Sequence, residues 1–410
     1  MQFEEIHIIN PILKALKDEN YLTPTPIQAQ AIPLVLKGFD VFASAQTGTG
    51  KTAAFAIPII QHLIHGQEES KGQKRIKALV ITPTRELAIQ IGENFSNYAK
   101  YTNIKNTVIF GGVNQKSQTN KIEQGVDILI ATPGRLLDLM NQGYISLKHI
   151  EYFVLDEADR MLDMGFINDI NKILDKLPAK RQSLFFSATM PKNIIELSKK
   201  ILNDPKQVEV NPTSSTAETI QQLLYYTNKS DKKNLLLHIL EDKKMEQVLV
   251  FSRTKHGADR IVRDLVKNKI GAAAIHGDKA QNQRQKALSQ FKDRKIKVLV
   301  ATDIAARGID IEKLQYVLNY DIPNLPETYV HRIGRSGRAG ETGMAISICE
   351  PEENVFVQEI ESLINLSIPV SKKNPFPQTE SPMNNQEKKA FEKEKQKRKN
   401  EFFANRKKSR

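Results

Sequence analysis

The fold is decided by the stretch Ala45-Gln46-Thr47-Gly48-Thr49-Gly50-Lys51-Thr52. It follows an apolar stretch, Asp40–Ala45, that predicts a strand, and it precedes a stretch, Ala53–Ile64, that predicts a helix. Glycines let backbone N–H groups approach a phosphate closely, and the N-terminus of the following helix favours negative charge. The stretch therefore predicts a phosphate-binding loop, although Ala45 stands where such loops usually carry their first glycine.

Two side chains of this loop have predicted chemical roles. Lys51 is expected to reach the terminal phosphates of ATP, and the hydroxyl of Thr52 is expected to be a ligand of Mg²⁺. The loop residues predicted to bind ATP are Ala45, Gln46, Thr47, Gly48, Thr49, Gly50, Lys51 and Thr52.

Short strand candidates on both sides of this loop alternate with helix-length intervals. This alternation predicts βαβ units and parallel sheets, and strands covered on both faces should read as unbroken apolar runs. The first series includes Asp40–Ala45, Ala78–Thr82, Asp127–Ala131, Tyr152–Leu155 and Ser183–Phe186, and the second includes Gln247–Ser252, Ala272–His276, Lys297–Ala301, Tyr316–Tyr320 and Ala345–Cys349.

The polar stretch 211–216, with a helix-breaking proline, separates the two series and is predicted to be a flexible linker. A chain of 410 residues suits two domains rather than one core. We therefore predict an α/β protein with a first domain over 1–211, a second over 212–370, and a tail over 371–410 that is disordered or only transiently helical.

Charge is concentrated in this tail. The whole chain carries +13, of which 371–410 contributes +8 from 13 Lys/Arg and 5 Asp/Glu. The tail is either a solvated charge run or the binding site of an anionic partner, with equal weight on each. No apolar stretch reaches the length of a membrane span, no signal peptide is visible, and the single Cys349 is expected to be buried, so we expect a cytoplasmic protein.

Acidic residues follow the strand candidate Tyr152–Leu155, in the tetrapeptide Asp156-Glu157-Ala158-Asp159. Ligands of parallel sheets bind at the carboxyl ends of the strands, and two buried acids there need a cation or another partner. Asp156 is predicted to hold Mg²⁺ through water, and Glu157 to polarise the attacking water. The alternative, an acidic first turn of a helix, explains one of these acids well and three poorly.

The phosphate loop together with Asp-Glu-Ala-Asp resembles the DEAD-box RNA helicases, and the resemblance covers nearly all of residues 1–350. It implies two tandem RecA-like domains, ATP and Mg²⁺ as cofactors, and RNA as the partner. In 21–28, it also implies that Gln28 hydrogen-bonds the adenine edge, that Tyr21 stacks on the adenine ring, and that Phe3 is the upstream aromatic residue of the ATP site. Asn20 departs from the glycine usual before that tyrosine.

The second domain carries the complementary motifs of the same resemblance. The stretch 331–338, His-Arg-Ile-Gly-Arg-Ser-Gly-Arg, implies that Arg335 and Arg338 neutralise phosphoryl charge as it develops. Asp310 is implied to contact the ATP ribose. Residues expected to couple hydrolysis to strand separation are Ser187, Ala188, Thr189 and His331.

The resemblance also implies a set of RNA contacts at strand ends, where backbone N–H groups, hydroxyls and guanidinium groups can follow phosphates without reading bases. These residues are Pro83, Thr84, Arg85, Gly111, Gly112, Thr132, Pro133, Gly134, Arg135, Arg253, His276, Gly277, Gln281, Arg284 and Thr302.

The predicted function is an ATP-dependent RNA helicase that unwinds short duplexes locally or remodels ribonucleoprotein. Its tail and motif spelling resemble the bacterial RhlE-like group. We expect a monomer that binds single-stranded RNA and short duplexes with little sequence preference, without a membrane partner, and with ribosomal or RNA-decay proteins as candidate partners. Two alternatives stay open: a DNA helicase or translocase of the same superfamily, and an ATP-gated RNA clamp that acts by binding rather than turnover.

Overall fold

The computed structural model describes residues 2–45, 49–67, 75–210, 220–306, 314–337 and 343–382. The chain forms two compact units, and the division between them falls within 211–219, outside the described residues. The prediction of two α/β domains is therefore confirmed, whereas the domain boundaries at 211/212 and 370/371 stay predictions.

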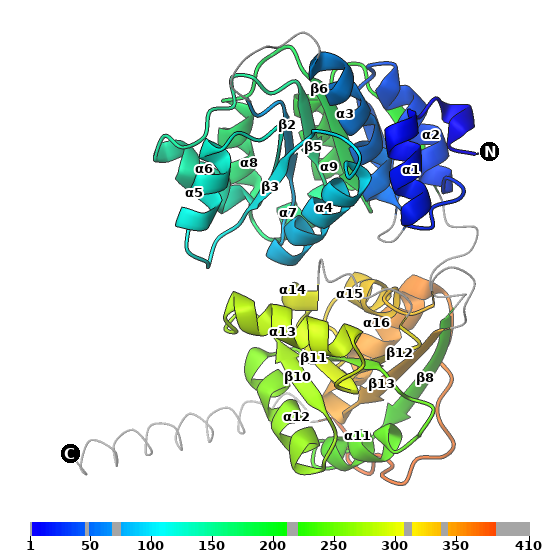
Figure 1. Ribbon diagram of the computed structural model, residues 1–410. Helices are drawn as coiled ribbons and strands as arrows, with labels where there is room; N and C mark the ends of the chain where they lie inside the picture. The colour runs from blue at the N-terminus through cyan, green and yellow to red at the C-terminus, as the bar shows by residue number, and fades with distance from the viewer. Residues whose placement is uncertain are drawn as a thin grey trace. The chain divides into compact units, whose positions relative to one another are not determined.

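The first unit is built on a seven-stranded sheet with the strand order β3-β4-β2-β5-β6-β1-β7, and its neighbouring strands are parallel. Figure 1 shows β2, β3, β5 and β6 of this sheet among the helices of the unit. The central strands are short apolar runs because helices cover both faces of the sheet. The strands are β1 (Val41–Ser44), β2 (Ala78–Ile81), β3 (Asn106–Ile109), β4 (Ile128–Ala131), β5 (Tyr152–Leu155), β6 (Gln182–Ser187) and β7 (Lys206–Glu209).

Successive side chains of these strands enter two separate cores, one on each face of the sheet. In β2, for example, Ala78 and Val80 belong to one core, whereas Leu79 and Ile81 belong to the other. This alternation follows from the two-residue period of a strand. The sheet is thus fixed between two layers of helices, which leaves the carboxyl ends of its strands to present polar residues.

Helices in the first unit divide between these two cores. Side chains of η1 (Glu4–Ile6), α1 (Asn10–Asp18), α2 (Pro26–Leu36), α3 (Lys51–Gln67) and α4 (Arg85–Tyr98) fill the first core. Side chains of α6 (Pro133–Asn141), α7 (Ala158–Asp163), α8 (Ile167–Leu174) and α9 (Lys192–Ile201) fill the second, against which α5 (Lys116–Glu123) also packs through Ile122.

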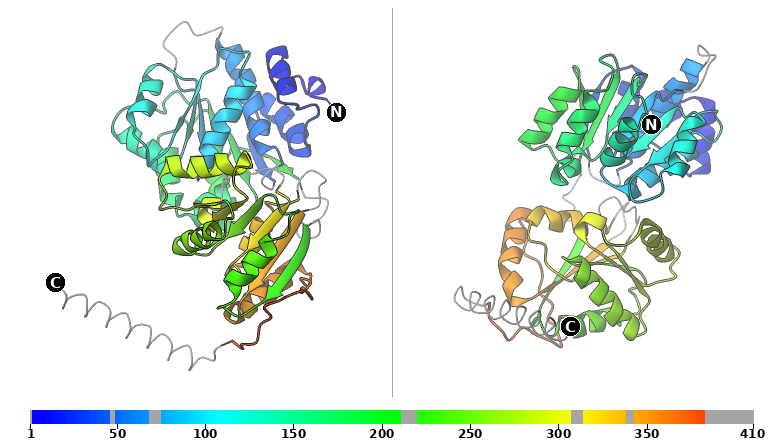
Figure 2. Two further views of the ribbon diagram at one scale, coloured as in Figure 1. Left: turned by 60° about the horizontal axis from the view of Figure 1, so that its bottom comes forward. Right: turned by 90° about the vertical axis from the view of Figure 1, so that its left-hand side faces the viewer.

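The second unit has a six-stranded parallel sheet with the order β10-β11-β9-β12-β13-β8. Figure 2 shows its strands between helices from two further directions. The strands are β8 (Ile220–Tyr226), β9 (Val248–Phe251), β10 (Ala272–Ile275), β11 (Val298–Ala301), β12 (Tyr316–Asn319) and β13 (Gly343–Cys349).

Alternate residues of β13 again enter two cores: Ile346 and Ile348 pack with α11 and α12, and Ala345 and Cys349 pack with α15 and α16. Cys349 is fully buried, as predicted. The helices are α11 (Lys232–Leu240), α12 (Lys255–Lys267), α13 (Gln281–Lys292), α14 (Asp303–Ala306), α15 (Pro326–Ile333), η2 (Pro351–Glu353) and α16 (Asn354–Ile364).

The start of the predicted tail is ordered on the second unit. Val370 forms a parallel bridge with Leu224 of the edge strand β8. Farther along, the side chain of Asn228 accepts hydrogen bonds from the backbone N–H groups of Thr379 and Glu380, at 2.9 and 3.0 Å. Residues 371–382 therefore differ from the expected disordered tail, because the unpaired edge of β8 offers them hydrogen-bond partners. The remaining residues, 383–410, lie outside the described residues.

In the described part of the chain, no helix combines the length and apolar character that a membrane crossing would require.

Candidate functional site

Two of the predicted ATP-site segments and the predicted coupling segment follow three adjacent strands of the first unit. In the order β5-β6-β1, the acidic tetrapeptide follows β5, Ser187 closes β6, and the phosphate loop follows β1. Because the strands are parallel, their carboxyl ends meet at one edge of the sheet. The fold thus brings together segments that are more than a hundred residues apart in the sequence.

The described part of the phosphate loop is bound to helix α2. The Gln28 amide donates to the carbonyl oxygen of Gly50 at 3.2 Å, and the Thr25 hydroxyl donates to the carbonyl oxygen of Thr49 at 2.8 Å. Gly50 has a φ of +92°, and a Cβ there would lie 2.3 Å from the amide nitrogen of Gln28. Glycine is therefore needed at this position for both its backbone conformation and its close contact. Gln46, Thr47 and Gly48 lie outside the described residues.

Lys51 begins helix α3 and is buried, with 6% of its surface exposed. Its ammonium group has no hydrogen-bond partner among the residues that the structure describes. A buried ammonium group without a hydrogen-bond acceptor is unfavourable unless a ligand supplies one. The arrangement fits the predicted contact of Lys51 with a phosphate group.

Asp156 lies at the carboxyl end of β5 and is also buried. Burial raises the pKa of its carboxyl group to about 6, although the positive charge of Lys51 opposes this rise. Burial makes this carboxyl group costly to ionise, and a cation bound beside it would stabilise the ionised form. The donor set therefore fits a hydrated Mg²⁺ ion held by Asp156 and by the hydroxyl of Thr52 on α3.

Glu157 adopts the left-handed backbone conformation, with φ +54° and ψ +49°, at the N-terminus of α7. Its carboxylate accepts a hydrogen bond of 2.5 Å from Arg160, and both side chains are buried. A non-glycine residue in this conformation carries strain, and such strain is found most often at functional sites. The ion pair and the backbone together fix the direction of the predicted catalytic carboxylate.

A hydrogen-bond chain joins the acidic tetrapeptide to the predicted coupling residues. The carboxylate of Asp159 accepts from both the backbone N–H and the hydroxyl of Thr189, each at 3.1 Å. Ser187 donates from its hydroxyl to the carbonyl oxygen of Thr189, and its own carbonyl oxygen accepts from the N–H of Ala45. Phosphate loop, acidic tetrapeptide and coupling segment thus form one connected unit.

The two aromatic residues expected at the ATP site have different surroundings. Tyr21 is 41% exposed, and its ring centroid lies 6.0 Å from that of Tyr98. Phe3 is only 2% exposed and belongs to the first core. Phe3 thus packs among the apolar side chains of the first core, and its contact with a nucleotide stays a prediction.

The predicted RNA contacts of the first unit follow the carboxyl ends of β3, β4 and β2, the three strands that lie on the other side of β5 in the same sheet. Thr84 caps α4, and the guanidinium of Arg85 lies so close to Gly112 that a Cβ there would meet its Nη1 at 2.2 Å. Arg135 donates to the Gln118 side chain and to the carbonyl oxygen of Val113, both at 3.2 Å. The structure gathers Pro83, Thr84, Arg85, Gly111, Gly112, Thr132, Pro133, Gly134 and Arg135 at this end of the sheet.

In the second unit, the predicted RNA contacts again follow three adjacent strands, β10, β11 and β9. His276 and Gly277 follow β10, Thr302 follows β11, and Arg253 follows β9. His276 is buried, and its Nε2 atom lies 3.1 Å from the Asp259 carboxylate. Gln281 and Arg284 are buried on the first turns of α13.

The Arg253 side chain contacts other residues of the second unit. Its guanidinium donates to the carbonyl oxygen of Ile322 at 2.7 Å and pairs with the Glu353 carboxylate. Its backbone N–H donates to Asp321, whose carboxylate also contacts the buried ammonium of Lys232. The Arg253 side chain, which is 37% exposed, thus pairs with the buried Glu353 at the edge of an ionic cluster that also holds the buried Lys232, a contact that the resemblance did not imply.

Helix α15 contains a buried arginine to which the sequence analysis gave no role. Arg332 forms a two-pronged ion pair with Asp303, at 2.6 and 2.8 Å, and donates to the carbonyl oxygen of Asp321 at 2.6 Å. The pair fixes α15, and so His331 and Arg335, against the segment that follows β11. The expected site residues Asp310 and Arg338 lie outside the described residues.

Comparison with known proteins places these motifs in one family. Residues 25–197 match the DEAD/DEAH box helicases, and residues 231–340 match the helicase conserved C-terminal domain. The ATP-dependent RNA helicase RhlB of Pasteurella multocida is 43% identical over 90% of this chain and 88% of its own length. The ATP-dependent RNA helicase CshA of Limosilactobacillus reuteri is 41% identical over 88% of this chain and 72% of its own length.

Solved structures support the same assignment. Dbp5 of S. cerevisiae, bound to RNA and ADP BeF3, is 30% identical and aligns with a TM-score of 0.79 over 90% of this chain and 95% of that one. The paired α/β domains are therefore RecA-like helicase domains, as the resemblance implied. Combined with the phosphate loop, the acidic tetrapeptide and their shared sheet edge, these matches show that the chain belongs to the DEAD-box family of ATP-dependent RNA helicases.

Proposed function

We propose that this helicase separates short RNA duplexes, or remodels ribonucleoprotein, by assembling its catalytic centre from residues of both units. The observation that carries the proposal is the division of the predicted catalytic side chains between the two units. Lys51, Asp156 and Glu157 meet at one sheet edge of the first unit, whereas Arg335 and the motif that contains it belong to the second. Neither unit alone carries the full set of groups that phosphoryl transfer uses.

The first unit binds and orients ATP. Lys51 contacts the terminal phosphates, Gln28 hydrogen-bonds the adenine edge, and Tyr21 stacks on the ring. The buried ammonium of Lys51, which has no hydrogen-bond partner in the described part of the chain, supports the first of these roles. Thr52 and Asp156 are the residues that would hold Mg²⁺, largely through water, and the bound ion would neutralise phosphate charge.

Glu157 polarises the attacking water, and its fixed backbone supports this role. Arg335 and Arg338 neutralise charge that develops on the phosphoryl group, because a planar guanidinium matches that geometry. Asp310 contacts the ribose. Nucleotide then sets the population of the closed form, within the limit of its differential affinity for that form.

RNA binds across the strand ends that carry the Thr-, Gly- and Arg-rich segments of both units. Contacts of this kind go to phosphate and ribose and imply little sequence preference. Preference for RNA over DNA comes from contacts to the 2′-hydroxyl and from A-form shape. Closure bends one strand, a short duplex loses base pairs, and hydrolysis followed by product release resets the protein.

We further propose a cytoplasmic monomer of the bacterial RhlE-like group, with ribosomal or RNA-decay proteins as partners. The spelling of the motifs and the short basic tail support the group assignment.

The deciding experiment compares ATPase stimulation by an RNA and by a DNA of matched sequence. We expect RNA to stimulate turnover more strongly, and equal stimulation would favour a DNA helicase or translocase. Lys51→Ala should abolish ATP turnover, while Lys37→Ala, an exposed lysine of the same unit, should leave it unchanged. Glu157→Gln separates a turnover enzyme from a clamp, since only a clamp would keep its biological activity.

A further inference from the structure

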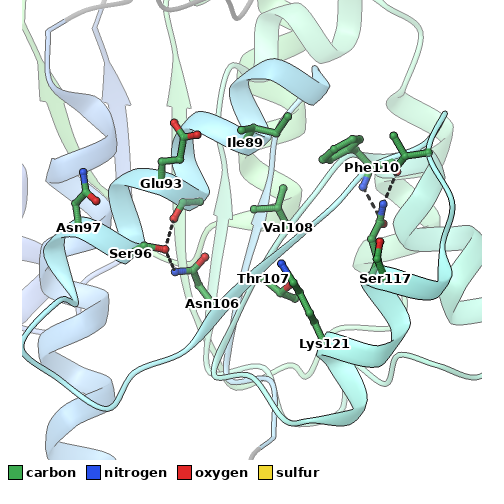
Figure 3. A pocket seen from close by; sticks show the side chains of 13 residues that line it. Ile89, Glu93, Ser96, Asn97, Asn106, Thr107, Val108, Phe110, Ser117 and Lys121 are labelled. Atoms are coloured by element: carbon green, nitrogen blue, oxygen red, sulfur yellow. Dashed lines mark hydrogen bonds between the residues drawn. The ribbon is translucent and has the colours of Figure 1, made fainter. Parts of the chain in front are cut away.

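A cavity of about 560 Å³ lies in the first unit, away from the strand ends that carry the ATP-site motifs. Its walls come from α4 on one side, α5 on the other, and the edge strand β3 between them (Figure 3). This volume is within the range of ligand pockets, but most of the lining side chains are polar. The occupant must therefore offer hydrogen-bonding groups rather than only apolar surface.

The backbone of β3 offers such groups toward the cavity. In the described residues β3 pairs with β4 alone. The carbonyl oxygen of Lys105 accepts from Ile128 of β4, and that of Ile109 accepts from Thr132 directly after β4, at 3.1 Å each. Hydrogen bonds of a parallel strand alternate in direction from residue to residue, so the backbone groups of Val108 and Phe110 point to the free edge. Both residues line the cavity.

The next position along this edge is already paired, by a side chain. The Gln118 amide on α5 accepts from the N–H of Phe110 at 3.2 Å and donates to its carbonyl oxygen at 3.1 Å. A primary amide that satisfies both backbone groups of one residue makes the same two bonds as a neighbouring strand. The outward backbone groups of Phe110 are thus paired by Gln118, whereas those of Val108 are available to another strand.

A buried hydroxyl faces the same space. Thr107 is 3% exposed and lines the cavity, and its Oγ1 atom has no hydrogen-bond partner in the described part of the chain. Buried hydroxyl groups are nearly always paired, so this one is suited to a ligand. Figure 3 shows Glu93 on α4 and Lys121 on α5 on opposite sides of the strand, which gives the cavity one acidic and one basic wall.

We propose that this cavity binds an extended peptide segment of a partner protein, which lies along β3 and pairs with the backbone of Val108. Addition of a strand to an open sheet edge is an established mode of peptide recognition, in which main-chain bonds supply affinity and flanking side chains supply selectivity. The two charged walls favour a peptide that places a basic side chain toward Glu93 and an acidic side chain toward Lys121.

Peptide binding at this edge is coupled to RNA binding, a step that rests on the proposed function. Gln118, which lines the cavity, also accepts from Arg135, and Arg135 donates to Val113 on the cavity wall. Arg135 is one of the proposed RNA contacts. A peptide that shifts Gln118 therefore changes the support of Arg135, and by linkage RNA changes peptide affinity by the same factor.

The test begins with a phage-displayed library of random nine-residue peptides, selected on the full-length protein. The strongest binders are synthesised, and their affinity is measured by fluorescence anisotropy for the wild type, Val108→Pro and Val108→Ala. Proline removes the N–H that points to the free edge but none of the bonds to β4, and edge strands tolerate proline. We expect Val108→Pro to weaken peptide binding by about tenfold, and Val108→Ala to change it by less than about threefold.

Thr107→Val serves as a second variant, with nearly the same shape and no hydroxyl, and should weaken the same peptides by about threefold. Circular dichroism and RNA-stimulated ATPase activity without peptide should match the wild type for all three variants. A folding defect in Val108→Pro would leave the Thr107→Val comparison as the deciding one.

Three results would overturn the proposal. The library could yield no peptide that binds the wild type more tightly than these variants. A selected peptide could bind Val108→Pro and Thr107→Val as tightly as the wild type. A single-stranded RNA oligonucleotide could displace the peptide completely and lose affinity through the same substitutions, which would assign the cavity to RNA. Absence of RNA-stimulated turnover in the wild type would instead contradict the proposed function and leave the peptide comparison valid.

Discussion

The side-chain amide nitrogen of Gln28 lies 3.2 Å from the carbonyl oxygen of Gly50, so the proposed adenine reader also supports the phosphate loop. The oxygen of the same Gln28 amide accepts a hydrogen bond from the N–H of Thr25 and completes the capping box of α2. The proposed adenine contact and the shape of the phosphate loop therefore depend on one side chain. A change in the loop should for this reason also alter adenine binding.

Gly50→Ala should raise the KM for ATP by about tenfold or more, since a Cβ would displace the Gln28 amide and the positive φ would be strained. Gly38→Ala is the matched control, because Gly38 has a φ of +83° but nothing within 4 Å of its Cβ position. Both variants should lose about 1–2 kcal/mol of unfolding free energy to the left-handed backbone. Steady-state ATPase kinetics and urea unfolding check this, and equal KM values for the two variants would contradict it.

Asp156→Asn should stabilise the nucleotide-free protein at neutral pH while abolishing ATP turnover. The folded-state pKa of Asp156 is raised from 3.8 to about 6, so the folded state holds this proton more tightly than the unfolded state. Its contribution to stability is full below pH 3.8 and is lost as the pH rises through about 6. The gain from asparagine should therefore be small near pH 4 and reach at most about 3 kcal/mol near pH 8.

Urea unfolding of both proteins at these two pH values measures the effect. A difference in unfolding free energy that does not change with pH would show that the ionisation of Asp156 is not its source.

The central strands could be predicted from the sequence, whereas three edge strands could not. All strand candidates correspond to observed strands, with ends that differ by one or two residues. The strands outside the prediction are β3, β7 and β8, and each lies at the edge of its sheet. The sequences of these three strands mix polar and apolar residues, because one side of each strand is partly exposed, whereas the fourth edge strand, β10, keeps the apolar run Ala272–Ile275 that makes it predictable.

Site residues could be predicted where a motif is contiguous in the sequence, but their partners could not. Nothing in the local sequence links Asp159 to Thr189, or Arg332 to Asp303. These contacts exist because parallel strands bring their carboxyl ends together. The burial of Phe3 was also beyond prediction, since a single aromatic residue near a chain end fits a core and a ligand site equally well.

Arg332→Met should destabilise the second unit by about 2–3 kcal/mol, because it removes the hydrogen bonds of the buried guanidinium to Asp303, whose carboxylate is 25% exposed and can still be hydrated. The exposed pair of Arg294 and Glu246, with N–O distance 3.0 Å and both side chains 70% exposed, supplies the control. Arg294→Met should change the unfolding free energy by less than about 1 kcal/mol. Urea unfolding of the full chain tests both, and similar values for the two would rule out a structural role for the Arg332 pair.

Deletion of 383–410 should weaken RNA binding and flatten its salt dependence without loss of stability. The segment carries 11 Lys/Arg and 4 Asp/Glu, and each neutralised phosphate contributes about 0.7 to the log–log salt slope on single strands. Deletion of 371–410 should give the same change in slope and also lower the melting temperature, since 371–382 bond to β8 and Asn228. RNA titrations over a range of salt concentrations measure the slope, and an unchanged slope in both truncations would refute a role for the tail charge.

The contacts of Asn228 with Thr379 and Glu380 also hold these two residues at one place on the second domain. The residues that follow this anchor are therefore joined to the domain at a fixed position. Such an anchor would allow the C-terminal extension to be replaced by one of another length or charge. The two helicase domains before it would keep their structure.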